Sequence, residues 1–206
     1  MNQNLNSILV VGSTGLVSGE TMKLLCKSVP GKSLIISATR GFKKEEIKIN
    51  HKTIRNIRGF DATNPYNWEE IIKLYKPSTI AIISNCRHFL ALHKVISKEE
   101  YINYSPRVIL VGTTGVYSPT QKYSNLYKEI ESLFFSSNLY NPVLIRPSLI
   151  YGDKNDQNMN KVISFIKKYK FWPLLCNGRG DFQPVYYKNV SEIINKAILM
   201  TDKCGA

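Results

Sequence analysis

The segment at residues 7–19, SILVVGSTGLVSG, constrains the fold more than any other part of the chain. Its apolar run at residues 8–11 leads directly into Gly12, Ser13, Thr14 and Gly15, and a helical pattern follows. A glycine turn lets the backbone approach a ligand without a Cβ in the way, and the free N–H groups at a helix N-terminus favour an anion. A strand, a glycine turn and a helix in this order predict a site for the diphosphate of a dinucleotide, although an ordinary strand-to-helix turn has the same pattern.

Composition bounds the class of protein. The 206 residues suffice for one domain with a hydrophobic core and a small appendage, and 43% of them are hydrophobic, as in soluble globular proteins. No apolar run approaches the roughly 20 residues that span a bilayer, and the first residues lack the pattern of a signal peptide. The four cysteines stand far apart without a C-x-x-C pair, so we expect reduced thiols in a cytoplasmic protein without a membrane span.

The net charge favours a phosphorylated small molecule as ligand. A formal charge of +13 also permits nucleic acid as a partner. However, the basic residues are scattered, and neither zinc-finger spacing nor an aromatic RNA-binding motif is present, so we do not expect nucleic-acid binding. His51, His88 and His93 lie outside the motifs described below and lack metal-ligand spacing, so we expect no metal site.

Apolar strand-like runs alternate with helical segments along the whole chain. The expected strands are residues 8–11, 33–38, 54–60, 79–84, 107–111 and 142–146, and the expected helices are residues 19–28, 66–75, 88–102, 122–136, 158–168 and 190–200. This alternation predicts an α/β fold with a doubly wound parallel sheet of the Rossmann type. Residues 1–150 would form the dinucleotide-binding domain and residues 151–206 a partial substrate lobe. Ligands of such sheets bind beyond the carboxyl ends of the strands.

Three stretches of the sequence resemble the short-chain dehydrogenase/reductase superfamily. They are VVGSTGLVSG, VILVGTTGVYS and LIRPSLIYGDKNDQN, and the later segment PLLCNGRGDFQPVYYKNV resembles the same superfamily. The branch they resemble is the extended and atypical one, with epimerases and dehydratases of nucleotide sugars. The resemblance covers essentially the whole chain and is more specific for fold and cofactor class than for substrate.

The resemblance implies a set of cofactor-binding residues. They are Gly12, Ser13, Thr14, Gly15, Leu16 and Val17 around the diphosphate, with Arg40, Asp61, Ser84, Arg146 and Pro147 after later strands. Ser18 stands where the family usually has a third glycine. Arg40, where an acidic residue would select NAD, favours NADP over NAD, unless it is a solvated loop charge. Asp61 would accept a hydrogen bond from adenine, or would simply cap its own turn.

The resemblance also implies catalytic and substrate-binding residues. Thr113 matches the hydroxyl residue that binds the reacting oxygen, and Tyr123 matches the acid–base tyrosine of a Y-x-x-x-K helix, with Tyr127 where the lysine should be. Lys128 is one position late, about 100° around the helix. The alternative for Tyr123 and Lys128 is an amphipathic surface helix. The candidates for substrate binding are Thr114, Tyr151 and Arg179, although Arg179 is equally an exposed turn residue.

Two functional hypotheses follow. The first is an NAD(P)-dependent enzyme that transfers hydride on a nucleotide sugar or a related carbonyl compound. The second is a non-catalytic NAD(P)-binding redox sensor or assembly factor that has lost the Tyr-Lys dyad. By analogy with many relatives, the chain would form a homodimer.

Overall fold

A parallel sheet of six strands organises the part of the chain that the computed structural model describes, namely residues 7–29, 33–41, 54–119, 122–152, 156, 159–171 and 183–200. The strands lie in the order β3-β2-β1-β4-β5-β6. Their bounds are Ser7–Val11 for β1, Leu34–Thr39 for β2, Ile54–Arg58 for β3, Thr79–Ile82 for β4, Arg107–Val111 for β5 and Val143–Ile145 for β6. The prediction of a doubly wound parallel sheet is therefore confirmed.

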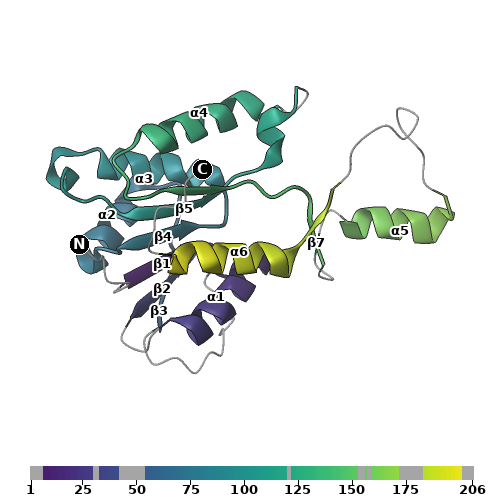
Figure 1. Cartoon of the computed structure of the whole chain (residues 1–206), viewed down its shortest axis with the longest axis horizontal. Coiled ribbons are helices and arrows are strands. Elements are labelled where there is room, and N and C mark those ends of the chain that lie inside the picture. Colours follow the sequence, from purple (N-terminus) through teal and green to yellow (C-terminus); the bar gives the residue numbers. More distant parts are fainter. Residues whose placement is uncertain are drawn as a thin grey trace.

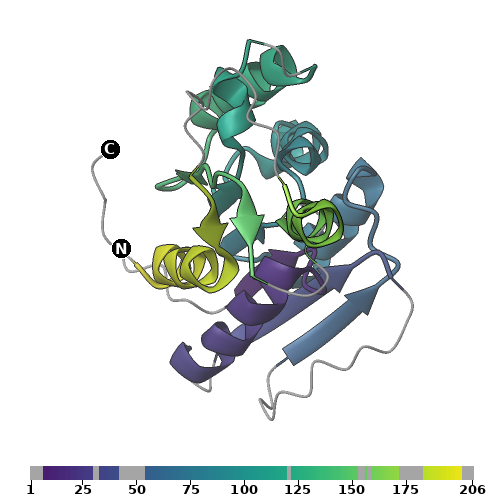
Figure 2. The same ribbon diagram turned by 90° about the vertical axis from the view of Figure 1, so that its right-hand side faces the viewer.

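Helices cover both faces of the sheet (Figure 1). On one face, α1 (Leu16–Ser28) and α6 (Tyr187–Leu199) lie side by side, as Figure 2 also shows. The opposite face is covered by α2 (Pro65–Tyr75), α3 (Phe89–Ile96) and α4 (Ser124–Ser136). Short 3-10 turns follow β4, α3 and β5: η1 (Cys86–His88), η2 (Glu99–Tyr101) and η3 (Thr114–Tyr117).

The central strands consist mostly of apolar residues because they are buried on both faces. All residues of β1, β4 and β5 are buried. Successive side chains of a strand point to opposite faces. Thus Leu9 and Val11 pack in the core beneath α2, α3 and α4, whereas Ile8 and Val10 pack against α1 and α6. This double burial fixes the position of the strand that carries the glycine turn.

The helix expected at residues 88–102 is interrupted. Helix α3 ends at Ile96, and Lys98 has an extended backbone with ψ 149 before η2 begins. The Lys98 ammonium pairs with Glu69 of α2, and the backbone N–H of Ser97 still bonds to the carbonyl oxygen of His93 at 3.0 Å. The apolar pattern continued past this break because Tyr101 of η2 is also buried.

The segment after β6 leaves the sheet. Strands β7 (Ile150–Tyr151) and β8 (Val185–Tyr186) form a separate parallel pair, and α5 (Met159–Tyr169) projects away from the sheet at the right of Figure 1. None of the residues of α5 is buried. No helix in the described ranges is both long and apolar enough to cross a membrane. The division of the chain near residue 150 stays a prediction.

Candidate functional site

A cavity of about 800 Å³ opens at the carboxyl ends of the first four strands. Its walls come from the turns that follow β1, β2, β3 and β4, and Ile150 and Asp156 of the later segment close one side. Strands β1 and β4 are neighbours at the centre of the sheet. From β1 the chain adds β2 and β3 on one side, and from β4 it adds β5 and β6 on the other side, so the strand order reverses between β1 and β4. In open α/β sheets this switch point is where ligands bind. The lining residues include Gly12, Thr14, Gly15, Leu16, Val17, Ser18, Thr39, Arg40, Asp61, Thr63, Ser84, Asn85 and His88.

Gly12 is required by the backbone and by its neighbour. Its φ is +83, a conformation that residues with a Cβ rarely adopt. A Cβ built on Gly12 would lie 2.4 Å from the Cβ of Ser84, and its N–H donates to the carbonyl oxygen of Ala38 at 2.9 Å. The turn after β1 is thus held between Ala38 of β2 and Ser84, which follows β4. Gly12 in this turn lines the cavity.

Ser18 takes the place of the family's third glycine without opening the turn. The side chain is buried, and its hydroxyl donates to the carbonyl oxygen of Gly12 and lies 3.2 Å from that of Gly15. A glycine at this position would let the helix approach the turn, whereas Ser18 holds the turn through its hydroxyl bond to the Gly12 carbonyl oxygen.

The predicted diphosphate residues divide between the cavity and the core. Gly12, Thr14, Gly15, Leu16 and Val17 line the cavity. Ser13 is fully buried, and its hydroxyl accepts a hydrogen bond of 2.7 Å from Ser37 of β2. Its side chain therefore braces the turn from within, and only its backbone is available for a ligand.

The start of α1 is suited to an anion. The N-cap residue is Gly15, which has no side chain, so no side-chain cap satisfies the N–H groups of the first turn. Residues 16–19 carry no acidic side chain that would compete for the positive end of the helix dipole. The N-terminus of α1 therefore has the geometry and the field of a phosphate-binding helix end.

Arg40 and Asp61 lie on the wall formed by the turns after β2 and β3. The Asp61 Oδ1 accepts hydrogen bonds from the N–H of Thr63 at 2.9 Å and from the Thr63 hydroxyl at 2.7 Å. These two bonds, the backbone one first, lower the pKa of Asp61, and the charges of Arg40 and His88 act in the same direction. Both interpretations of Asp61 are thus compatible with the geometry: it caps its turn and it lines the cavity.

His88 is the cavity residue that the sequence did not single out. It ends η1, and its Nδ1 lies 2.7 Å from the Ser84 hydroxyl oxygen, a hydrogen-bond distance. Burial lowers the pKa of His88, and the nearby guanidinium groups of Arg87 and Arg40 lower it further, whereas Asp61 raises it. The available signal was positional, because His88 follows closely after a strand whose carboxyl end lines the cavity.

The catalytic candidates lie on the neighbouring side of the sheet, after β5. Thr113 is the N-cap of η3, and its Oγ1 accepts a hydrogen bond of 3.1 Å from the N–H of Gly115. Tyr123 stands at the N-cap of α4 and is 39% exposed. The Arg87 guanidinium carbon lies 5.2 Å from the centre of its ring, and the Lys122 Nζ lies 5.7 Å from it. The side chain of Thr114 is exposed.

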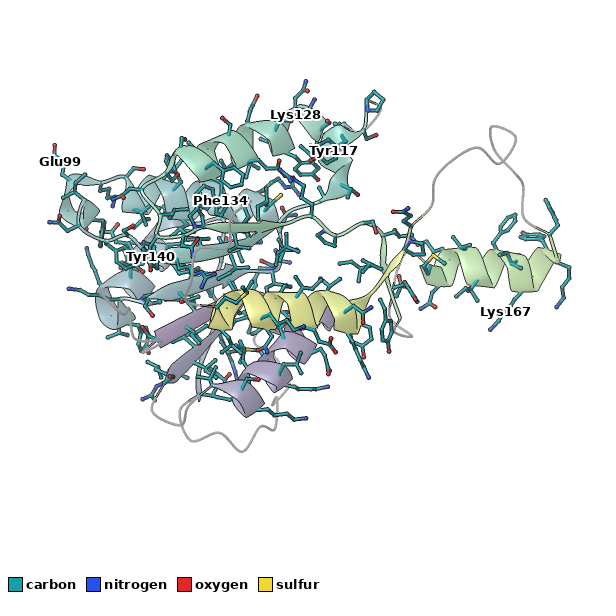
Figure 3. All side chains as sticks on the ribbon, viewed as in Figure 1. Glu99, Tyr117, Lys128, Phe134, Tyr140 and Lys167 are labelled. Atoms are coloured by element: carbon teal, nitrogen blue, oxygen red, sulfur yellow. The ribbon has the colours of Figure 1, made fainter. Side chains whose placement is uncertain are left out.

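Lys128 is on the solvent side of α4 (Figure 3). The one-residue displacement from the family's lysine position thus places it on the outer surface of the helix. The cations that the structure shows beside the Tyr123 ring are instead Arg87, from the turn after β4, and Lys122.

Arg146 pairs with α4. Its Nε and Nη2 each donate to a Glu131 carboxylate oxygen at 2.8 Å, and Glu131 raises the pKa of the guanidinium. The guanidinium carbon also lies 5.7 Å from the ring centre of Tyr117. The carbonyl oxygen of Pro147 lies 3.4 Å from the N–H of Thr114. Arg146 and Pro147 therefore join β6 to α4 and η3, and a direct contact of either with a cofactor stays a prediction.

Tyr151, predicted to bind substrate, does not line this cavity. Tyr151 in β7 packs its ring against Tyr186 of β8 at a centroid distance of 5.7 Å. Arg179 and His51 lie outside the described residues, as do Cys176 and Cys204, whereas Cys26 and Cys86 are free thiols. Within the described ranges, no three His, Cys, Asp or Glu side chains come together in a way that could hold a metal ion.

Comparison with solved structures places the fold. A short-chain dehydrogenase/reductase of the wide type from Veillonella parvula, in complex with NADP, has a TM-score of 0.64 and 16% identity, over 96% of this chain and 89% of the other. The fold is that of the short-chain dehydrogenases/reductases. The Bordetella bronchiseptica enzyme WbmH, in complex with NAD+, matches with a TM-score of 0.68 and 12% identity over 94% of this chain and 72% of that one.

A third similar structure is the yeast methylglyoxal/isovaleraldehyde reductase Gre2 complexed with NADPH. It has a TM-score of 0.69 and 11% identity, over 97% of this chain and 76% of that chain. Neither a protein-family model nor a curated protein matches the sequence. At these identities the likeness establishes the fold that the sequence motifs predicted, and it leaves the chemistry to be argued from the residues.

Proposed function

We propose that the cavity binds a nicotinamide dinucleotide and that the protein is an NAD(P)-dependent enzyme acting on a nucleotide sugar or a related carbonyl compound. The observation that carries the proposal is the turn at Gly12, held against Ser84 and opening onto the N-terminus of α1. The lining of the cavity fits this ligand. A bare backbone and a helix end suit the diphosphate, and the cavity of about 800 Å³ extends from there along the turns after β2 and β3.

NADP is the preferred form in this proposal. Arg40 lines the cavity after β2, where its planar donor fork suits the 2′-phosphate of NADP. The hydroxyl groups of Thr14 and Thr39 meet at 3.3 Å on the same wall, so this side of the cavity offers donors. The similar structures include complexes with NAD+ and with NADPH, so cofactor preference has to come from this chain's own residues.

The chemistry would take place on the β5 side of the sheet. When bound, the nicotinamide supplies hydride transfer. The Thr113 oxygen already accepts from the N–H of Gly115, so its own hydroxyl hydrogen can be directed at the reacting oxygen of the substrate. Tyr123 is the proposed proton donor and acceptor, and the Arg87 guanidinium over its ring would hold the phenol in place.

A binding protein without turnover is the second candidate. It is favoured by one observation: the family's lysine position holds Tyr127, and Lys128 lies on the exposed side of α4. In this alternative the cofactor cavity is kept and the Tyr-Lys dyad is lost. The homodimer and the cytoplasmic location stay predictions in either case.

Calorimetry and a turnover assay test the proposal together. We expect tighter binding of NADPH than of NADH, and a loss of that difference in Arg40→Met. With nucleotide sugars and 4-keto sugars as substrates, absorbance at the reduced nicotinamide band should change, and Tyr123→Phe should abolish the change. Tyr127→Phe is the matched control, because it removes the hydroxyl of a neighbouring tyrosine. The ring centres of Tyr123 and Tyr127 are 6.4 Å apart. Binding without turnover on any substrate would support the second candidate, and failure to bind either dinucleotide would refute both.

A further inference from the structure

We propose that His88 is a proton-linked contact for a phosphate group in the cofactor cavity, taking up a proton when a phosphorylated ligand binds. This rests on the proposed function, because the ligand is taken to be a nicotinamide dinucleotide. His88 is not part of any motif of the sequence. Three separate observations place it at the site: it lines the cavity, it bonds to the residue that holds the glycine turn, and charged groups approach it from three turns.

The groups around His88 act on its protonation in opposite directions, and their combined effect lowers its pKa. Arg87, next to it in η1, and Arg40, after β2, oppose a positive charge on the ring, and so does burial. Asp61, after β3, favours the charge. A second carboxylate in the wall, Asp156, has its Oδ1 3.1 Å from the N–H of Met159 at the start of α5. The protein's own groups therefore favour a neutral ring.

A phosphate group changes this balance. It brings a charge of about −1 to −2, and an opposite charge within about 4–6 Å favours the charged form of a titrating group. Because the same phosphate also pairs with Arg40 or with the N-terminus of α1, it weakens the repulsion that those positive groups exert on the ring. Both effects favour a protonated His88 in the complex.

The partner of His88 can serve both protonation states. A serine hydroxyl donates or accepts, so the Ser84 oxygen can donate to Nδ1 of the neutral ring and accept from Nδ1 of the charged ring. In the charged ring Nε2 is then a donor for a phosphate oxygen. Ser84 also presses its Cβ against the turn at Gly12, so His88 is held by the same residue that holds the diphosphate loop.

Proton uptake during binding is the measurement. Isothermal titration calorimetry of NADPH and of NADH in buffers with different ionisation enthalpies gives the number of protons taken up at each pH. We expect uptake of a large fraction of one proton near neutral pH, and an affinity that falls as pH rises by at most tenfold per pH unit, since one group is linked. His88→Asn keeps an amide for Ser84 and removes the titrating ring.

His93→Asn is the matched control. His93 lies on the adjacent helix α3, its pKa is also lowered by burial, and its Nδ1 lies 3.0 Å from the Ser137 hydroxyl rather than in the cavity. Uptake should vanish in His88→Asn and persist in His93→Asn. NMR gives a readout on the unmodified protein. Because the chain has only three histidines, the pH titration of each histidine's ring protons can be followed with and without NADPH.

Each outcome decides the proposal. Uptake with NADPH alone assigns the contact to the 2′-phosphate, and uptake with both dinucleotides assigns it to the diphosphate; both support it. Binding without uptake, uptake retained in His88→Asn, or an NMR titration of His88 unmoved by NADPH would overturn it while leaving the proposed function intact. If neither dinucleotide binds, the proposed function and this inference both fail.

Discussion

Replacing Gly12 by alanine should lower the free energy of unfolding and should also abolish cofactor binding. At φ +83 a residue with a Cβ costs about 1–2 kcal/mol relative to glycine. The new Cβ would also lie 2.4 Å from the Ser84 Cβ, and overpacking of this kind costs about 1–3 kcal/mol. The two effects sum to about 2–5 kcal/mol, a large part of the roughly 5–15 kcal/mol that holds a typical domain folded.

Thermal unfolding and denaturant titration measure this loss. For a chain of this length about 1 kcal/mol shifts Tm by roughly 2–4 °C, so Gly12→Ala should lower Tm by roughly 4–20 °C. The added Ser84→Gly substitution removes the clashing Cβ and should recover the steric part but not the backbone part. This double variant keeps the test decisive if Gly12→Ala alone does not fold.

Gly19→Ala is the matched control. Gly19 lies within α1, and a Cβ there would meet only the Ser13 carbonyl oxygen at an ordinary 3.9 Å. Because alanine favours helix over glycine by about 0.5–1 kcal/mol, this variant should be as stable as the parent or slightly more stable. Equal stability of Gly12→Ala and Gly19→Ala, or NADPH affinity unchanged in Gly12→Ala, would refute the reasoning.

Three further predictions concern the supports of the site. Ser18→Ala should cost about 1–2 kcal/mol, measured by urea denaturation, because the Gly12 carbonyl oxygen loses its buried hydroxyl donor; an unchanged midpoint would contradict this. Trp68→Phe removes the Nε1–H donor to the Ala62 carbonyl oxygen at 2.9 Å and leaves a cavity, so a loss of about 2–4 kcal/mol and weaker dinucleotide binding are expected in calorimetry. Burial lowers the pKa of His93, so the folded protein binds this proton less readily than the unfolded chain, and the free energy of unfolding falls as pH drops through the ordinary histidine range. Urea midpoints of His93→Gln should therefore decline less on acidification than those of the parent, and equal slopes would argue against this reasoning.

The elements were predictable where local chemistry decides them. The apolar runs of β1, β4 and β5 marked strands buried on both faces, and the glycine turn at residues 12–15 marked the ligand end of the sheet. The interruption of α3 at residue 97 was not predictable, since the buried side chain of Tyr101 continued the apolar pattern past it. The interactions of Arg146 were not predictable either. The sequence pattern predicted that Arg146 follows a strand, but its bidentate pairing with Glu131 depends on where α4 lies.

The sequence by itself determined the alternation of strands and helices and the turn that needs glycine, because these depend on the periodicity of apolar residues and on the absence of a Cβ. Only the tertiary structure decided which side chains surround the cavity. Ser84 and His88 meet Gly12, Arg40 and Asp61 because β4 pairs with β1 and β2 with β3, and this strand order brings together residues that are far apart along the chain. The packing of η1 against α4 likewise brought Arg87 to the Tyr123 ring. Such contacts arise from packing between elements, which the local pattern of residues does not encode.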